Sequence, residues 1–245
     1  SLDMPSDFLA YLVPIHRDFI HEDGLTLSSR SGNRVMVDIF HPSALSFNVL
    51  ITGTTGQGKS MLANKLLQDQ LERGTKALVL DLGNSFQKNA RFHNGTILSQ
   101  KINPLQFRDA RYLKEFILAA VDEGLGRKVE GHLFELVQSA LDNGAVTFRE
   151  LISEVEKGLP GMSHYFSELY EYFTDEETRP AELTYCDFGL YPEAMKAPLV
   201  IHLIQLFKSL SGRKMFVFDE CWHLLEKNAS YVEECFRTFR KQNAS

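Results

Sequence analysis

One octapeptide constrains the fold of this chain more than any other feature. Residues 53–60 read Gly-Thr-Thr-Gly-Gln-Gly-Lys-Ser and satisfy the pattern G-x-x-x-x-G-K-S/T at every position. An apolar run, Asn48–Ile51, precedes it, and a helical pattern from about Ser60 to Arg73 follows and is closed by Gly74. The order of strand, glycine-rich loop and helix predicts a P-loop, whose backbone N–H groups surround the phosphates of a nucleotide.

The residue types in this loop indicate what each of them does. Lys59 is expected to reach the β- and γ-phosphates, and the Ser60 hydroxyl is expected to ligate Mg²⁺. We therefore expect ATP and Mg²⁺ as cofactors. The predicted nucleotide contacts are Gly53, Thr54, Thr55, Gly56, Gln57, Gly58, Lys59, Ser60 and Met61.

A second motif ends in two carboxylates. Met215–Phe218 is an apolar strand candidate that carries Asp219 and Glu220 at its C-terminal end. In a P-loop enzyme the first carboxylate holds Mg²⁺, partly through water, and the second orients and deprotonates the attacking water. The pair predicts ATP hydrolysis, with Glu220 and Lys59 as catalytic residues. The alternative is that the two carboxylates simply open a polar loop.

Four further side chains have both a functional and a structural interpretation. Asp81 ends another apolar strand, so it is a candidate to contact Mg²⁺ or water indirectly, or to serve as a turn or cap carboxylate. Arg237 and Arg240 lie on a predicted helix after the carboxylate pair. Either arginine could stabilise γ-phosphate charge across a subunit interface, Arg240 being favoured, or form an ordinary cationic helix end. Trp222, close to the pair, is expected to pack in the core.

Strand and helix patterns alternate in two parts of the chain, which predicts an α/β fold with a mainly parallel sheet. We expect a lead-in with a β segment over residues 1–46, and a core in two parts over 47–105 and 181–245. Residues 106–180 are helical in pattern and predict an all-α insertion of at least four helices. The strand candidates are Arg34–Phe40, Asn48–Ile51, Ala77–Leu80, Thr96–Leu98, Leu183–Phe188 and Lys214–Phe218, with a long helix over Pro192–Ser211.

Two local patterns refine the insertion. Thr147 and Glu150 stand in capping-box spacing at the start of one helix. After the break at Gly158–Gly161, the spacing of Phe166, Leu169, Tyr170 and Phe173 predicts one more helix.

Composition argues against several classes of protein. The net charge of −6 and the pI of about 5.8 disfavour a surface that attracts nucleic acid throughout, although a local basic patch stays open. The apolar stretch Ala197–Phe207 is interrupted by polar residues and is shorter than the roughly 20 residues that span a bilayer. We therefore expect no direct membrane insertion. The three cysteines lack metal-ligand spacing, which fits reduced thiols in the cytoplasm.

Taken together and in order, five segments resemble the motor domain of the ATPases of conjugation and type IV secretion, the pilus-assembly family of the TraC type. The two P-loop motor motifs alone are generic. Their combination with D-x-G-x-S, N-P-L, D-E-x-W-x-L-L and R-T-x-R-K patterns is much more specific. The segments are Asn48–Ser60, Leu80–Ser85, Asn103–Leu105, Phe218–Leu225 and Phe236–Asn243.

The resemblance implies a RecA-like core with an all-α insertion that works as a homo-oligomer, such as a hexamer. It implies inner-membrane secretion-apparatus proteins as partners, at the cytoplasmic face of the inner membrane, and a role in assembly and substrate transfer. By comparison with the family, we expect this sequence to lack the N-terminal domain and the second part of the core to be truncated at Ser245, with low hydrolytic activity.

Two competing functions remain at this stage. A DNA-translocating ring ATPase of the coupling-protein or HerA/FtsK type shares both motor motifs. The mixed charge of the insertion weighs against it, because DNA channels favour basic or aromatic loops, but contact with nucleic acid stays open. A nucleotide-binding module without turnover is the other alternative.

Overall fold

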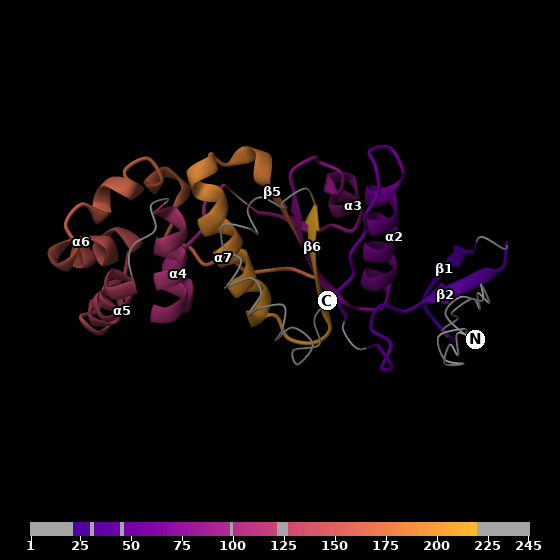
Figure 1. The fold of residues 1–245 in the computed structure, drawn as a ribbon, viewed down its shortest axis with the longest axis horizontal. Coiled ribbons are helices and arrows are strands. Elements are labelled where there is room, and N and C mark those ends of the chain that lie inside the picture. The colour runs from indigo at the N-terminus through magenta and orange to yellow at the C-terminus, as the bar shows by residue number, and fades with distance from the viewer. Residues whose placement is uncertain (1–21, 30–31, 45–46, 99, 122–126, 220–245) are drawn as a thin grey trace, which may run out of the picture. The chain divides into compact units, whose positions relative to one another are not determined.

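The computed structural model describes residues 22–29, 32–44, 47–98, 100–121 and 127–219 (Figure 1). The chain forms two compact units, residues 1–47 and residues 48–245. In the first unit, β1 (Leu25–Ser28) and β2 (Arg34–Val37) form an antiparallel pair. The strand predicted to reach Phe40 ends early, because the Asp38 carboxylate accepts the backbone N–H of Phe40 at 2.9 Å and turns the chain.

The second unit is built on a four-stranded parallel sheet in the order β4-β5-β3-β6. Residues Ala77–Leu80 are completely buried, as expected for a parallel strand that is covered on both faces. The predicted parallel α/β sheet is confirmed. Its strands are β3 (Lys76–Asp81), β4 (Thr96–Ile97), β5 (Leu183–Asp187) and β6 (Lys214–Asp219).

Helices lie on both sides of this sheet. Figure 1 shows α2 (Lys59–Glu72) and α3 (Gln87–Phe92) on one side and α7 (Glu193–Ser209) on the other. Eleven of the seventeen residues of α7 are buried, because α7 has the sheet on one side and packs against an insertion helix on the other. No helix among the described residues combines the length and apolarity needed to cross a bilayer.

The C-terminal end of α7 is closed by a buried lysine from the next strand. Lys214 Nζ donates to the carbonyl oxygens of Phe207, Lys208 and Leu210 at 3.1, 3.1 and 2.9 Å. They belong to the last turn and the C-cap of α7, where most carbonyls lack intrahelical partners, and Phe207 O also accepts the Leu210 N–H at 3.2 Å. The ammonium thus supplies both hydrogen bonds and a favourable charge at the negative end of the helix dipole.

The insertion is helical, as predicted. Its described elements are η1 (Pro104–Phe107), α4 (Ala110–Ala120), α5 (Arg127–Asp142), α6 (Phe148–Gly158), η2 (Met162–Phe166) and η3 (Tyr170–Tyr172). The capping box is confirmed at α6, where Thr147 Oγ1 accepts the Glu150 N–H and the Glu150 carboxylate accepts the Thr147 N–H.

The helix predicted through Phe166 and Phe173 is wrong, since two short 3-10 helices stand in its place. Backbone pairing with Ile102 explains the difference. The Ile102 N–H donates to Tyr172 O and the Thr174 N–H donates to Ile102 O, both at 3.0 Å. Such pairing requires an extended chain at Phe173, so a continuous helix cannot form there.

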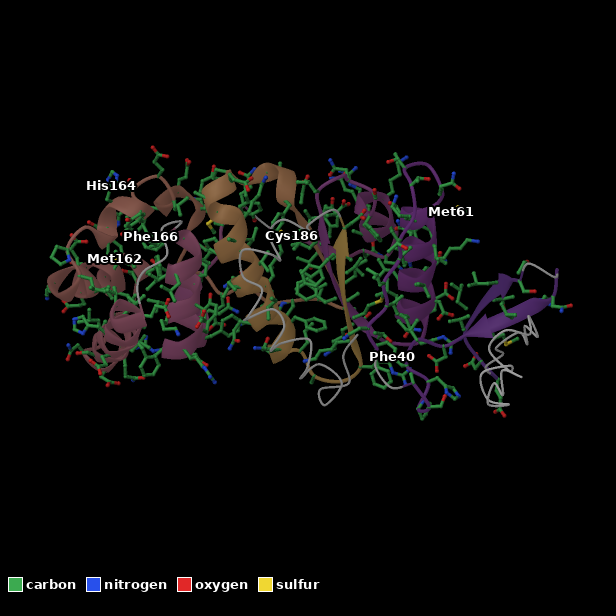
Figure 2. The ribbon with its side chains drawn as sticks, in the orientation of Figure 1. Phe40, Met61, Met162, His164, Phe166 and Cys186 are labelled. Carbon is green, nitrogen blue, oxygen red and sulfur yellow. The ribbon has the colours of Figure 1, made fainter. Side chains whose placement is uncertain are left out.

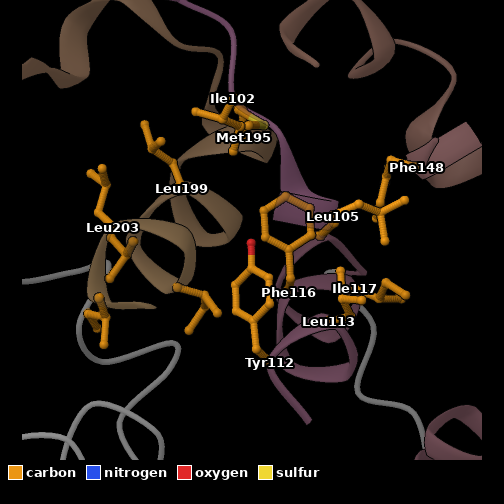
Figure 3. Close-up of a cluster of buried hydrophobic side chains, with 14 of the residues drawn as sticks. Ile102, Leu105, Tyr112, Leu113, Phe116, Ile117, Phe148, Met195, Leu199 and Leu203 are labelled. Carbon is orange, nitrogen blue, oxygen red and sulfur yellow. The ribbon is translucent and has the colours of Figure 1, made fainter. Parts of the chain in front are cut away.

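An aromatic cluster joins the insertion helices. The ring centroid of Phe148 lies 5.5, 5.2 and 4.8 Å from those of Phe116, Phe166 and Phe173, all in edge-on geometry. Each such pair stabilises packing by about 0.5–1.5 kcal/mol beyond area burial. Figure 3 shows apolar side chains of α4 facing those of α7, so the core of the insertion continues into the layer that covers the sheet.

The strand predicted at Asn48–Ile51 is also wrong. The structure assigns no strand there, and Val49 and Leu50 are 47% and 70% exposed. None of the described strands pairs with this run. A four-residue segment without ladder hydrogen bonds and without a covered face has nothing to hold it extended.

Candidate functional site

The glycine-rich loop leads directly into α2. Gly58 is the N-cap residue with φ 84° and ψ 16°, and Gly56 has φ 81°. A Cβ added at either glycine would meet no atom within 4 Å. The requirement for glycine therefore comes from the left-handed backbone conformation and not from lack of space.

The loop presents its backbone to solvent. Residues 52–58 are exposed, and Lys59 and Ser60 are half-buried. Lys59 Nζ donates to Thr54 O at 3.1 Å, so the ammonium reaches back across the loop. The side chain of Met61 is 64% exposed at the start of α2 (Figure 2).

The N-terminus of α2 is suited to an anion. No side chain caps it, and its first turn contains no acidic residue. Its N–H groups and the positive end of the helix dipole are therefore available to phosphate oxygens. The exposed loop, Lys59 and this helix end fit a nucleotide's phosphates.

Three aspartates mark the carboxyl end of the sheet. Strand register places Asp81 of β3 opposite Asp187 of β5 on one side and opposite Asp219 of β6 on the other. In parallel sheets ligands bind at this end of the strands. Asp187 was not predicted as a site residue, although its place at the end of a predicted strand was a usable signal.

Asp81 is completely buried and organises the turn that follows β3. Its carboxylate accepts the N–H of Gly83 at 2.9 Å, the N–H of Phe86 at 2.8 Å and the hydroxyl of Tyr185 at 3.2 Å. These bonds occupy both carboxylate oxygens. The turn interpretation of Asp81 thus accounts for these three hydrogen bonds, and an indirect contact with Mg²⁺ stays a prediction.

Tyr185 of β5 contacts both β3, through Asp81, and the loop that follows β3, through Asn84. Its hydroxyl also lies 3.2 Å from Asn84 Oδ1. Burial raises the pKa of Tyr185 above its ordinary value, and the nearby charge of Asp81 raises it further. The hydroxyl therefore keeps its proton and remains a hydrogen-bond donor. In the sequence this tyrosine looked like an ordinary strand residue.

A polar network that the sequence analysis missed joins α2 to the loop after β3. Asn64 Nδ2 donates to Ser60 O at 2.9 Å and to Ser85 O at 3.2 Å. Asn89 Nδ2 of α3 donates to Asn64 Oδ1 at 3.1 Å. The sequence did offer a signal, because asparagine is a poor helix former and yet Asn64 stands inside a predicted helix, four residues after the predicted Mg²⁺ ligand Ser60.

Several predicted site residues lie outside the described residues, and their roles stay predictions. They are Glu220, Trp222, Arg237 and Arg240. Within the described ranges no group of histidine, cysteine and acidic side chains is arranged to hold a metal ion by itself.

Comparison with known families and structures agrees with this geometry. Residues 24–123 match the family described as the TraG P-loop domain. The fold resembles the structure of VirB4 of Thermoanaerobacter pseudethanolicus, with a TM-score of 0.71 at 19% identity, over 94% of this chain and 77% of that one. A search of curated proteins gives no significant match.

Two structures of the plasmid coupling protein TrwB are also similar. The structure of TrwB with the non-hydrolysable ATP analogue ADPNP has a TM-score of 0.53 at 20% identity, over 78% of this chain and 60% of that one. An unbound form of TrwB has a TM-score of 0.50 at 18% identity, over 78% and 59%.

These matches confirm the resemblance to the ATPases of conjugation and type IV secretion, and they confirm the α/β fold class that the sequence predicted. The chain contains a P-loop of the TraG type on an α/β fold like that of VirB4. A P-loop domain of this kind implies nucleotide binding.

Proposed function

We propose that this chain is an ATP-hydrolysing motor domain that energises assembly of, and substrate transfer by, a bacterial type IV secretion or conjugation system. The observation that carries the proposal is the uncapped N-terminus of α2, which follows the glycine-rich loop and begins with Lys59, whose ammonium reaches back to Thr54 O, beside the carboxyl end of a parallel sheet. The TraG-type match over residues 24–123 and the VirB4-like fold support it.

The proposed chemistry assigns one task to each residue. The loop amides and Lys59 bind the phosphates and offset their charge, and Ser60 and Asp219 hold Mg²⁺, Asp219 partly through water. The bound Mg²⁺ would supply charge neutralisation at the phosphates. Glu220 accepts the proton of the attacking water. Arg240, or Arg237, stabilises the γ-phosphate charge from a neighbouring subunit of a homo-oligomer such as a hexamer.

The charge of the insertion favours a protein substrate over DNA. Residues 106–180 carry 15 acidic and 8 basic side chains, although the whole chain has a net charge of only −6. A surface that threads DNA needs basic groups to offset phosphate charge. This charge favours a protein as the substrate. The resemblance to the secretion ATPases implies secretion-apparatus proteins as partners, at the cytoplasmic face of the inner membrane.

The likeness to TrwB keeps a DNA-translocating ring ATPase as the second candidate. The proposal is tested by the steady-state ATPase rate of the purified protein, with and without single- and double-stranded DNA. We expect Mg²⁺-dependent turnover that DNA leaves unchanged and that Glu220→Gln abolishes. Stimulation by DNA of about tenfold or more would favour the alternative, since a substrate can contribute binding energy to the transition state.

Two other outcomes would contradict the assignment in different ways. Turnover that survives Glu220→Gln would show that another group activates the water. Failure of the wild-type protein to bind ATP in the presence of Mg²⁺ would refute the nucleotide site itself. Arg240→Ala should slow hydrolysis only in preparations that form oligomers, and an equal loss in a monomeric preparation would exclude action across a subunit interface.

A further inference from the structure

The Asn64 side chain links three elements around the start of α2. Its amide nitrogen donates to Ser60 O in α2 and to Ser85 O in the loop after β3. Its amide oxygen accepts from Asn89 Nδ2 of α3 at 3.1 Å, and Asn89 Nδ2 also lies 3.4 Å from the Asn64 backbone carbonyl. Both donors and the acceptor oxygen of the amide are thus engaged.

The loop that receives this amide is itself held in place. Asp81 accepts the N–H groups of Gly83 and Phe86, which bracket Ser85. Tyr185 of the neighbouring strand contacts both Asp81 and Asn84. Because Asp81 at the buried end of β3 bonds the residues on both sides of it, the Ser85 segment is tied to the edge of the sheet.

Asn64 lies one helical turn after Ser60, on the same face of α2. A hydrogen bond to Ser60 O therefore acts directly on the backbone of the residue whose hydroxyl is expected to ligate Mg²⁺. The chain continues from the Ser60 turn to Lys59 and Gly58, so a fixed Ser60 backbone also fixes the exit of the phosphate loop.

We propose that Asn64 is a positioning residue for the nucleotide site: it anchors the first turn of α2 to the Ser85 loop and so holds the backbone of Ser60, whose hydroxyl would ligate Mg²⁺. The inference rests on the proposed function. It adds a residue that does not touch the nucleotide but acts through Ser60, with Asn89 as its support. Groups that orient a metal ligand typically change metal affinity by about 10–100-fold when they are removed.

The test separates orientation of Ser60 from general stability. Binding of a fluorescent ATP analogue is titrated with Mg²⁺ and again with EDTA, for the wild type and for Asn64→Ala. We expect Asn64→Ala to weaken binding about tenfold with Mg²⁺ and to change binding with EDTA by less than about twofold. Alanine is the better helix former, so α2 should be retained.

Two further variants make the result interpretable. Gln68→Ala is the matched control, because the Gln68 amide lies on the same helix but contacts only the exposed Glu72 carboxylate. This variant should bind the ATP analogue as the wild type does, with Mg²⁺ and with EDTA. Asn89→Ala removes the contacts of Asn89 Nδ2 with Asn64 Oδ1 and Asn64 O and should give a smaller loss of affinity, again confined to binding in the presence of Mg²⁺. If a thermal melt shows that Asn64→Ala is unfolded, Asn89→Ala tests the proposal in its place: a loss of affinity confined to Mg²⁺ supports the positioning role, and unchanged affinity refutes it.

Each outcome bears on one of the two proposals. If the wild type binds the analogue but Asn64→Ala binds equally well, or loses affinity equally with and without Mg²⁺, the positioning role is refuted and the nucleotide site stands. If the wild type binds no analogue in either condition, the proposed function fails. A loss confined to Mg²⁺ supports the role of Asn64.

Discussion

Acid is expected to destabilise this protein through one core histidine. His202 of α7 is completely buried, and its Nδ1 lies 2.8 Å from the Tyr112 hydroxyl of α4. Burial lowers the pKa of His202 from 6.5 to about 3, because the interior cannot replace the water that would hydrate an imidazolium. The folded protein therefore holds this imidazole neutral through the whole mildly acidic range.

The direction of the effect follows from the two states of the chain. As pH falls below 6.5 the unfolded chain takes up a proton on His202, whereas the folded chain does so only near pH 3. The contribution of His202 to the free energy of unfolding is therefore fully present above pH 6.5 and is lost as the pH falls toward 3. Acidification from pH 7 to pH 5 should lower the free energy of unfolding by about 2 kcal/mol through His202, a factor of about 30.

Urea unfolding at pH 7 and pH 5 measures this loss. His202→Asn places an amide near the position of Nδ1, can still bond Tyr112, and cannot titrate. Between the two pH values the wild type should lose about 2 kcal/mol more than this variant. His164→Asn, which changes an exposed imidazole of η2, should lose as much as the wild type (Figure 2). Equal pH dependence of the wild type and His202→Asn would refute the reasoning.

Three further changes test the loop, the helix cap and the capping box. Lys59→Ala should reduce affinity for Mg²⁺-ATP by about tenfold or more, because a charge-assisted contact is lost; unchanged binding in a calorimetric titration would exclude that role. Lys214→Met removes the ammonium that bonds three carbonyls at the end of α7, two of them in buried contacts, and should lower the free energy of unfolding by about 1–3 kcal/mol; a loss below about 0.5 kcal/mol would mean that water replaces the ammonium. Thr147→Ala should cost about 1 kcal/mol in urea unfolding by removing the N-cap of α6, and an equal cost for Ser153→Ala in the exposed middle of that helix would contradict a capping effect.

The features predicted correctly are those set by local chemistry. Gly56 and Gly58 adopt backbone conformations that other residues avoid, so their spacing before Lys59 predicts the loop and the start of α2 without any knowledge of the rest of the chain. The same holds for the capping box at Thr147, whose partners lie three residues apart. The parallel strands were also predictable, because a strand buried on both faces requires the continuous apolar runs seen at β3 and β5.

Partners far apart in the chain decided the rest. The sequence left Asp81 equally suited to a metal-related role and to a turn; its contact with Tyr185, 104 residues away, belongs to the turn arrangement. Phe173 carries a helical pattern, but pairing beside Ile102 keeps the chain extended there. At Asn48–Ile51 the apolar run predicts a strand, yet no described strand pairs with it.

What the sequence by itself determined is therefore the P-loop, the class of fold and the approximate bounds of α2, α7 and the four strands of the parallel sheet, since these depend on residues within a few positions of each other. What only the tertiary structure decided is which side chains meet at the sheet edge and which are removed from water. Asn64 reaches Ser85, and Tyr112 of α4 meets His202 in the core, because packing brings these distant segments together.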